Sequence, residues 1–255
     1  MHAAYPTHTK VIIMRSLSVV LLPLLIFGVC QAEDHAATPP AAKPAPAHAA
    51  DAPAAVAAEA AAQGLNAQQA LERLIRGNKR FVGDLTNTGN KDSERRIAVA
   101  KGQNPIAIVV CCSDSRVPPE QLFDVGLGDI FVIRVAGNVV DAIGLGSIEY
   151  AAMHLHVPLV VVMGHERCGA VTAAISGKPA PAHVLAITDL IQRHLVGTTP
   201  APGDAVDQAV CINASAVART IASSAPLLKD LVAAGKLTVV AVRYDLDDGT
   251  VKQLP

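Results

Sequence analysis

Residues 106–116 read IAIVVCCSDSR, and the first seven of them form a continuous apolar run. Such a run is typical of a strand that is buried on both faces of a parallel sheet. A second apolar run, Leu159 to Met163, is followed by GHERCG at residues 164–169. Two buried strands are therefore expected to end in thiol, imidazole and carboxylate side chains.

Apolar patterns in the rest of the chain alternate between strands and helices. Further strands are expected at 131–135 and 237–243, with a last short strand at 250–253 after a turn at Asp247-Asp248-Gly249. Helices are expected at 66–82, 93–101, 144–156, 169–176, 184–195, 204–224 and 226–234. This alternation predicts an α/β fold, with a mostly parallel central β-sheet flanked by helices in a single domain.

The first of these helices has the clearest boundary signals. Asn66 is the predicted N-cap, and Gln69 is its partner in a capping box. Gly77 and Asn78 are expected to weaken the helix near its end, because both residues have low helix propensity.

The two sheet-end motifs carry a donor set suited to zinc. Ligands bind beyond the carboxyl ends of strands in open α/β sheets, and Cys112, His165 and Cys168 all follow such ends. Two thiolates and one imidazole suit zinc, and three protein ligands leave a fourth position open for water, as in catalytic sites. His-x-x-Cys alone is a weak signal, and the prediction depends on its combination with Cys112-x-Asp114-x-Arg116.

Asp114 and Arg116 are two residues apart, so an extended segment projects both side chains to one side. They are predicted to pair, with the guanidinium keeping the carboxylate ionised and aimed at water on the metal. The alternative is a surface ion pair that contributes about 0–1 kcal/mol.

The N-terminal quarter differs in composition from the rest. Residues 1–32 resemble an export signal, with Lys10 and Arg15 before an apolar stretch and a small-residue cleavage site before Glu33. A transmembrane anchor and a lipid anchor on Cys30 are the alternatives. Residues 33–65 are rich in Ala and Pro and predict a flexible tether. The folded domain is expected to be 66–255, periplasmic or otherwise exported, with no stable membrane span in the mature chain.

Charge and cysteine content exclude other classes. The formal net charge is −1 with interspersed signs, so no nucleic-acid partner is expected. Cys111 and Cys211 are interpreted as buried core thiols, and two spare cysteines do not form a disulfide framework for a domain of this size.

The chain resembles the β-class carbonic anhydrases in two motifs, CSDSRV at 112–117 and GHERCGA at 164–170. The likeness extends to ALERL at 70–74, GNKRF at 77–81, KGQNP at 101–105, FVIR at 131–134 and SIEY at 147–150. The resemblance implies one Zn²⁺ per chain on Cys112, His165 and Cys168, with Asp114 and Arg116 as the catalytic dyad. It implies reversible hydration of carbon dioxide to bicarbonate by attack of zinc-bound hydroxide.

The same resemblance implies further features. Gln103, Phe131 and Tyr150 match substrate-pocket positions of the plant-type subgroup. Val109 stands where members with a closed, aspartate-ligated zinc have tryptophan, so the open, water-bound site is expected. Members form homodimers or multiples of dimers, with the active site near the shared interface. Two alternatives remain: a carbon disulfide hydrolase of the same fold, and a zinc-binding or thiol-redox protein without hydration activity.

Overall fold

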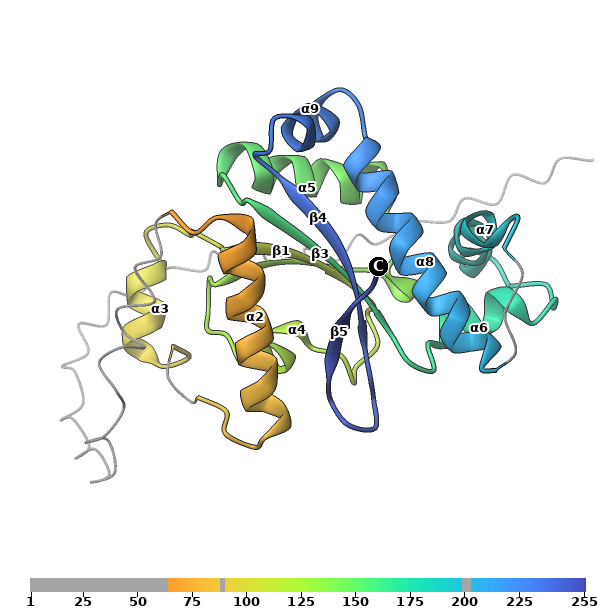
Figure 1. Ribbon diagram of the computed structural model, residues 1–255, viewed down its shortest axis with the longest axis horizontal. Coiled ribbons are helices and arrows are strands. Elements are labelled where there is room, and N and C mark those ends of the chain that lie inside the picture. Colours follow the sequence, from red (N-terminus) through yellow and green to blue (C-terminus); the bar gives the residue numbers. More distant parts are fainter. Residues whose placement is uncertain (1–63, 88–89, 199–202) are drawn as a thin grey trace, which may run out of the picture. The chain divides into compact units, whose positions relative to one another are not determined.

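A computed structural model describes residues 64–87, 90–198 and 203–255 (Figure 1). The predicted export signal at 1–32, and the tether at 33–65 apart from its last two residues, lie outside the described residues. None of the helices found in the described ranges has the length and apolar character needed to cross a bilayer.

One five-stranded sheet organises the described part of the chain. Its strands are β1 (Ala107–Cys111), β2 (Ile130–Arg134), β3 (Leu159–His165), β4 (Thr238–Tyr244) and β5 (Val251–Gln253). They lie in the order β2-β1-β3-β4-β5; the first three neighbour pairs are parallel, and β5 is antiparallel to β4. The predicted α/β fold with a mostly parallel sheet is confirmed.

Helices precede, connect and flank the strands. Their bounds are α2 (Ala67–Val82), α3 (Ser93–Val99), α4 (Pro119–Leu122), η1 (Ala136–Asn138), α5 (Ala142–His154), α6 (Gly169–Ile175), α7 (Val184–Leu195), α8 (Ala205–Ser223) and α9 (Leu227–Ala233). In Figure 1, α2 and α3 lie at the left of the view, and α6, α7 and α8 at the right. The sequence did not predict α4 or η1, because elements of three or four residues are too short to show a helical period.

The sheet has a separate apolar core on each face. Alternate residues of the central strands face opposite sides, so Val109 and Val161 join one cluster while Val110 and Val162 join the other. The first cluster includes residues of α2, α4, α6 and α7, and the second includes residues of α5, α8 and α9. The central strands β1 and β3 are thereby fixed from both sides, and so are the side chains at their ends.

Helix α2 has the predicted capping box at Asn66 and Gln69. The helix continues to Val82 as predicted, and Gly77 and Asn78, which were expected to weaken it, are both buried in it. A Cβ on Gly77 would lie 1.7 Å from the carbonyl oxygen of Phe123, so glycine permits this close approach. The Asn78 amide donates to the carbonyls of Leu122 and Gly249, which docks α2 against the rest of the domain.

Candidate metal centre

The structure brings Cys112, His165 and Cys168 together at the carboxyl ends of β1 and β3. Cys112 follows β1, His165 is the last residue of β3, and Cys168 is the N-cap of α6. All three are buried, and their ligand atoms lie within 4.8 Å of one another. Because β1 and β3 are adjacent in the sheet, residues more than fifty positions apart meet at one point.

His165 is oriented toward this cluster by the backbone of the next residue. Its Nδ1 lies 2.9 Å from the carbonyl oxygen of Glu166, which requires the proton on Nδ1 and leaves a lone pair on Nε2. His165 Nε2 and Asn138 Nδ2 are the two buried side-chain atoms without a hydrogen-bond partner in the described protein. A buried nitrogen lone pair beside two thiols fits a zinc ion, which would supply the missing partner.

The two thiols differ in acidity. The pKa of Cys112 is lowered, first by the hydrogen bond from Cys168 and then by the backbone N–H groups of Asp114 and Gly137. The pKa of Cys168 is raised by its bond to the Cys112 thiolate and by burial. The two sulfurs are thus hydrogen-bonded to each other, and binding of a divalent cation would require both to be thiolates.

The neighbouring Cys111 is chemically different. Burial raises its pKa to about 12, and the residue is fully enclosed in the core. The prediction that Cys111 is a core thiol is confirmed. Cys211, which was predicted to be core, is only half-buried on α8.

Asp114 and Arg116 form a bidentate pair beside the three ligands. The Arg116 Nη2 and Nε donate to the two Asp114 carboxylate oxygens at 2.7 and 3.0 Å, and the Arg116 backbone N–H donates at 2.9 Å. These bonds hold the pKa of Asp114 well below its usual range. The Asp114 Oδ2 lies 3.9 Å from His165 Nε2, so an ionised, fixed carboxylate borders the cluster.

Two supports of Cys112 were not predicted. Arg134 donates to the carbonyls of Cys112 and Asp114 at 3.0 and 2.6 Å, which holds the loop after β1. The Gly137 N–H donates to Cys112 Sγ at 3.3 Å, and the Asp114 N–H at 3.4 Å. In the sequence, Arg134 lies in the predicted strand at 131–135 and Gly137 follows that strand. That both residues bond Cys112 could not be read from the sequence, because it depends on the order of the strands in the sheet.

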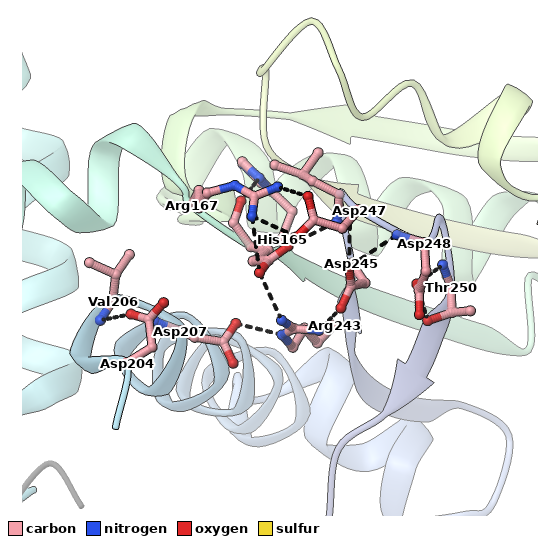
Figure 2. A network of polar contacts seen from close by, with 12 residues as sticks. His165, Arg167, Asp204, Val206, Asp207, Arg243, Asp245, Asp247, Asp248 and Thr250 are labelled. Atoms are coloured by element: carbon pink, nitrogen blue, oxygen red, sulfur yellow. Dashed lines mark hydrogen bonds and ion pairs between the residues drawn. The ribbon is translucent and has the colours of Figure 1, made fainter. Parts of the chain in front are cut away.

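An ionic network stabilises the turn between His165 and Cys168 from outside (Figure 2). Arg243 on β4 contacts Asp207 of α8, Asp245 and Glu166. Arg167 pairs with Asp247 in the β4–β5 turn through two hydrogen bonds. Glu166, Asp245 and Asp247 have the spacing of a cation site, but these arginines already supply their positive charge. Glu166 and Arg167, which the sequence left without a role, are thus part of the scaffold around the turn.

The structure does not bring the three predicted pocket residues to this cluster within one chain. Gln103 precedes β1, at the opposite end from Cys112, and lines a cavity of about 250 Å³ with Arg73, Arg95 and other residues. Phe131 pairs in register with Ile108, four residues before Cys112 or about 13 Å along the strand. Its ring lies 6.4 Å from that of Tyr150 on α5, and Tyr150 is 49% exposed. Their role in a substrate pocket stays a prediction.

Comparison with known proteins gives consistent matches. A sequence profile for the family described as carbonic anhydrase matches residues 107–251. Carbonic anhydrase 2 of Mycobacterium tuberculosis is 38% identical over 190 residues, which cover 72% of this chain and 91% of that protein.

Solved structures agree with these sequence matches. The β-carbonic anhydrase of Coccomyxa in complex with acetazolamide has a TM-score of 0.57 at 31% identity, covering 72% of this chain and 86% of that one. A tetrameric β-carbonic anhydrase from Sordaria macrospora has a TM-score of 0.59 at 24% identity, with coverages of 72% and 96%, and supports the fold.

Proposed function

This chain belongs to the β-class carbonic anhydrase family, and we propose that it hydrates carbon dioxide reversibly at the centre formed by Cys112, His165 and Cys168. The observation that carries the proposal is the pairing of a buried S₂N donor set with an ionised carboxylate at its edge. A purely structural zinc site uses four protein ligands, whereas this cluster offers three beside Asp114.

Zinc on these ligands would supply a Lewis acid that lowers the pKa of water to about 7. The side chains of this protein orient the attacking water molecule. Arg116 keeps the carboxyl group of Asp114 ionised. Near neutral pH this carboxylate therefore accepts hydrogen bonds and cannot donate one. A water molecule beside the cluster is thereby held with one proton toward Asp114 and its lone pair free to attack carbon dioxide.

The proposed centre is open, with Asp114 bound to Arg116 and not to the metal. Both carboxylate oxygens of Asp114 already accept bonds from the guanidinium, which favours this arrangement. Val109 is fully buried in the core at the position where a tryptophan is expected in closed members. A crystal structure of the zinc-loaded protein near neutral pH with an Asp114 oxygen within about 2.2 Å of zinc would contradict the open state.

Stopped-flow assays with two substrates test the proposed reaction. The zinc-loaded protein is expected to hydrate carbon dioxide and to leave carbon disulfide unchanged. Turnover of carbon disulfide without hydration of carbon dioxide would instead assign a hydrolase to the same ligands.

We also propose that the chain forms a homodimer, or a multiple of dimers, through β2 and α5. Strand β2 is an edge of the sheet in the described chain, and α5 beside it exposes Ile143 at 80%, Tyr150 at 49% and Met153 at 40%. Positions 143, 150 and 153 share one face of the helix. Apolar area of this kind on a sheet edge is characteristic of an interface, and it would bring Phe131 and Tyr150 to a second copy.

Export is proposed from the composition of residues 1–32. N-terminal sequencing of protein from a periplasmic fraction is expected to show a mature chain that begins near Glu33. Recovery of the protein with an intact N-terminus from the cytoplasm would contradict export.

A further inference from the structure

A series of hydrogen-bonded polar groups leads from the half-buried His194 to Cys112. It begins at His194 on α7, passes through Asn213 on α8, and ends at Gly137 in η1. Gly137 is the residue whose N–H donates to Cys112 Sγ. Helices α7 and α8 are consecutive, whereas Gly137 lies 76 positions from Asn213. None of the three residues belongs to either sheet-end motif.

Asn213 connects His194 to Gly137. Its side chain is fully enclosed, with no exposed area. Its Nδ2 donates to the Gly137 carbonyl at 2.8 Å, so its Oδ1 must face His194, whose Nδ1 lies 2.7 Å away. An amide oxygen only accepts, so His194 Nδ1 carries a proton in this contact. The orientation of Asn213 is thus determined at both ends.

The backbone of Gly137 needs a hydrogen-bond partner that fixes its conformation. Its φ of 68° and ψ of 18° lie in the left-handed region, which glycine adopts without strain but from which it also moves readily. A Cβ at this position would lie 2.7 Å from Ile191 Cδ1 and 3.1 Å from Ala170 Cβ. A side chain here would crowd Ile191 and Ala170 in a backbone conformation that favours glycine. The conformational freedom of Gly137 must therefore be limited by other residues.

We propose that Asn213, oriented by His194, is a positioning residue that holds Gly137 so that its N–H bonds the Cys112 thiolate. Partners of metal ligands fix the orientation of the ligand, and their loss typically lowers metal affinity by about 10–100-fold. The inference rests on the proposed zinc centre and adds two residues on α7 and α8 that control it.

The experiment compares zinc release from the full-length zinc-loaded protein and its variants into an excess of a coloured chelator. Asn213→Leu removes the donor to Gly137 at similar volume and is expected to release zinc about 10-fold faster. His194→Ala removes the group that orients Asn213 and is expected to act in the same direction by a smaller factor. Because His194 is only half-buried, this variant decides the question if Asn213→Leu does not fold.

Asn78→Leu is the matched control. Asn78 is also a buried asparagine that bonds backbone groups, but it belongs to α2 and contacts no ligand. It is expected to lower the urea midpoint while leaving the zinc release rate unchanged. Cobalt-loaded protein adds a second measurement, since the thiolate-to-cobalt absorption band should shift in Asn213→Leu and His194→Ala and not in Asn78→Leu.

Two results would overturn the inference, and they are distinguishable. If the wild-type protein retains zinc and both Asn213→Leu and His194→Ala release it at the wild-type rate with an unshifted cobalt band, the positioning role is wrong and the zinc centre stands. If the wild-type protein binds no zinc, the proposed centre is wrong and the inference fails with it.

Discussion

At the scale of single residues, the proposed centre has two parts. Cys112, His165 and Cys168 are the proposed metal ligands, and Asp114 is a carboxylate that stays ionised beside them. Arg116 contributes two side-chain hydrogen bonds to Asp114 and one from its backbone. The pKa of Asp114 is therefore lowered, and the carboxylate remains charged throughout the neutral range. In the proposed mechanism, a change of pH near neutrality therefore alters the protonation of the reacting water and leaves Asp114 ionised.

Replacing Asp114 by asparagine tests this division. Asp114→Asn should retain zinc, because the three ligands are unchanged, and should lower kcat/KM for hydration by about 10–100-fold. Stopped-flow hydration and metal analysis on one sample measure both quantities. Asp248→Asn, whose carboxylate bonds Thr250 in the β4–β5 turn, is the control and should retain full activity. Loss of zinc from Asp114→Asn would mean that Asp114 is itself a ligand.

Cysteine variants separate ligands from other thiols. Cys168→Ser should lose most of its zinc during dialysis, because a neutral hydroxyl replaces a thiolate ligand. Cys211→Ser removes a half-buried thiol outside the cluster and should retain wild-type zinc content. Equal zinc content in the two variants would exclude Cys168 as a ligand.

At the scale of elements, the strand ends bring the site together and the hairpin after β4 supports it. The pKa of Asp245 is lowered to about 2, first by the hydrogen bond from Arg243 and then by the N–H of Asp247. Ionised Asp245 therefore stabilises the folded state above its ordinary pKa of about 4. This contribution is lost as the pH falls through the folded-state value.

Urea unfolding of Asp245→Asn measures that contribution. Relative to wild type, the variant should lose about 1 kcal/mol of unfolding free energy near neutral pH, since the ion pair is partly exposed. The difference should shrink as the pH falls from about 4 to about 2. Arg243→Met should show the same dependence from the other side of the pair. A difference between Asp245→Asn and wild type that is constant over this range would contradict the assignment.

Most elements could be predicted from the sequence, because continuous apolar runs and capping signals are local. The three proposed ligands could be predicted for the same reason, because they lie in the two motifs at residues 112–117 and 164–170. The bonds from Gly137 and Arg134 to Cys112 could not be predicted, since they depend on β2 lying next to β1. The close contact of Gly77 with Phe123 could not be predicted either, because it is a tertiary contact.

At the scale of the whole molecule, the main expectation is association of copies through β2 and α5. Ile143→Asp places a charge on the exposed apolar face of α5 and should shift the protein from dimer to monomer in sedimentation velocity at low micromolar concentration. Ile97→Asp is the control, because Ile97 on α3 is 71% exposed and lies outside that face. Unchanged sedimentation of Ile143→Asp would place the interface elsewhere.

The central claim is that Cys112, His165 and Cys168 hold a zinc ion that makes this chain a carbonic anhydrase. Metal content and carbon dioxide hydration, measured on the same purified sample between about pH 6.5 and 9, test it most directly. We expect about one zinc per chain, activity that rises with pH, loss of activity on chelation and its return when zinc is added. Zinc-loaded protein that is inert toward carbon dioxide, or full activity without bound metal, would contradict the claim.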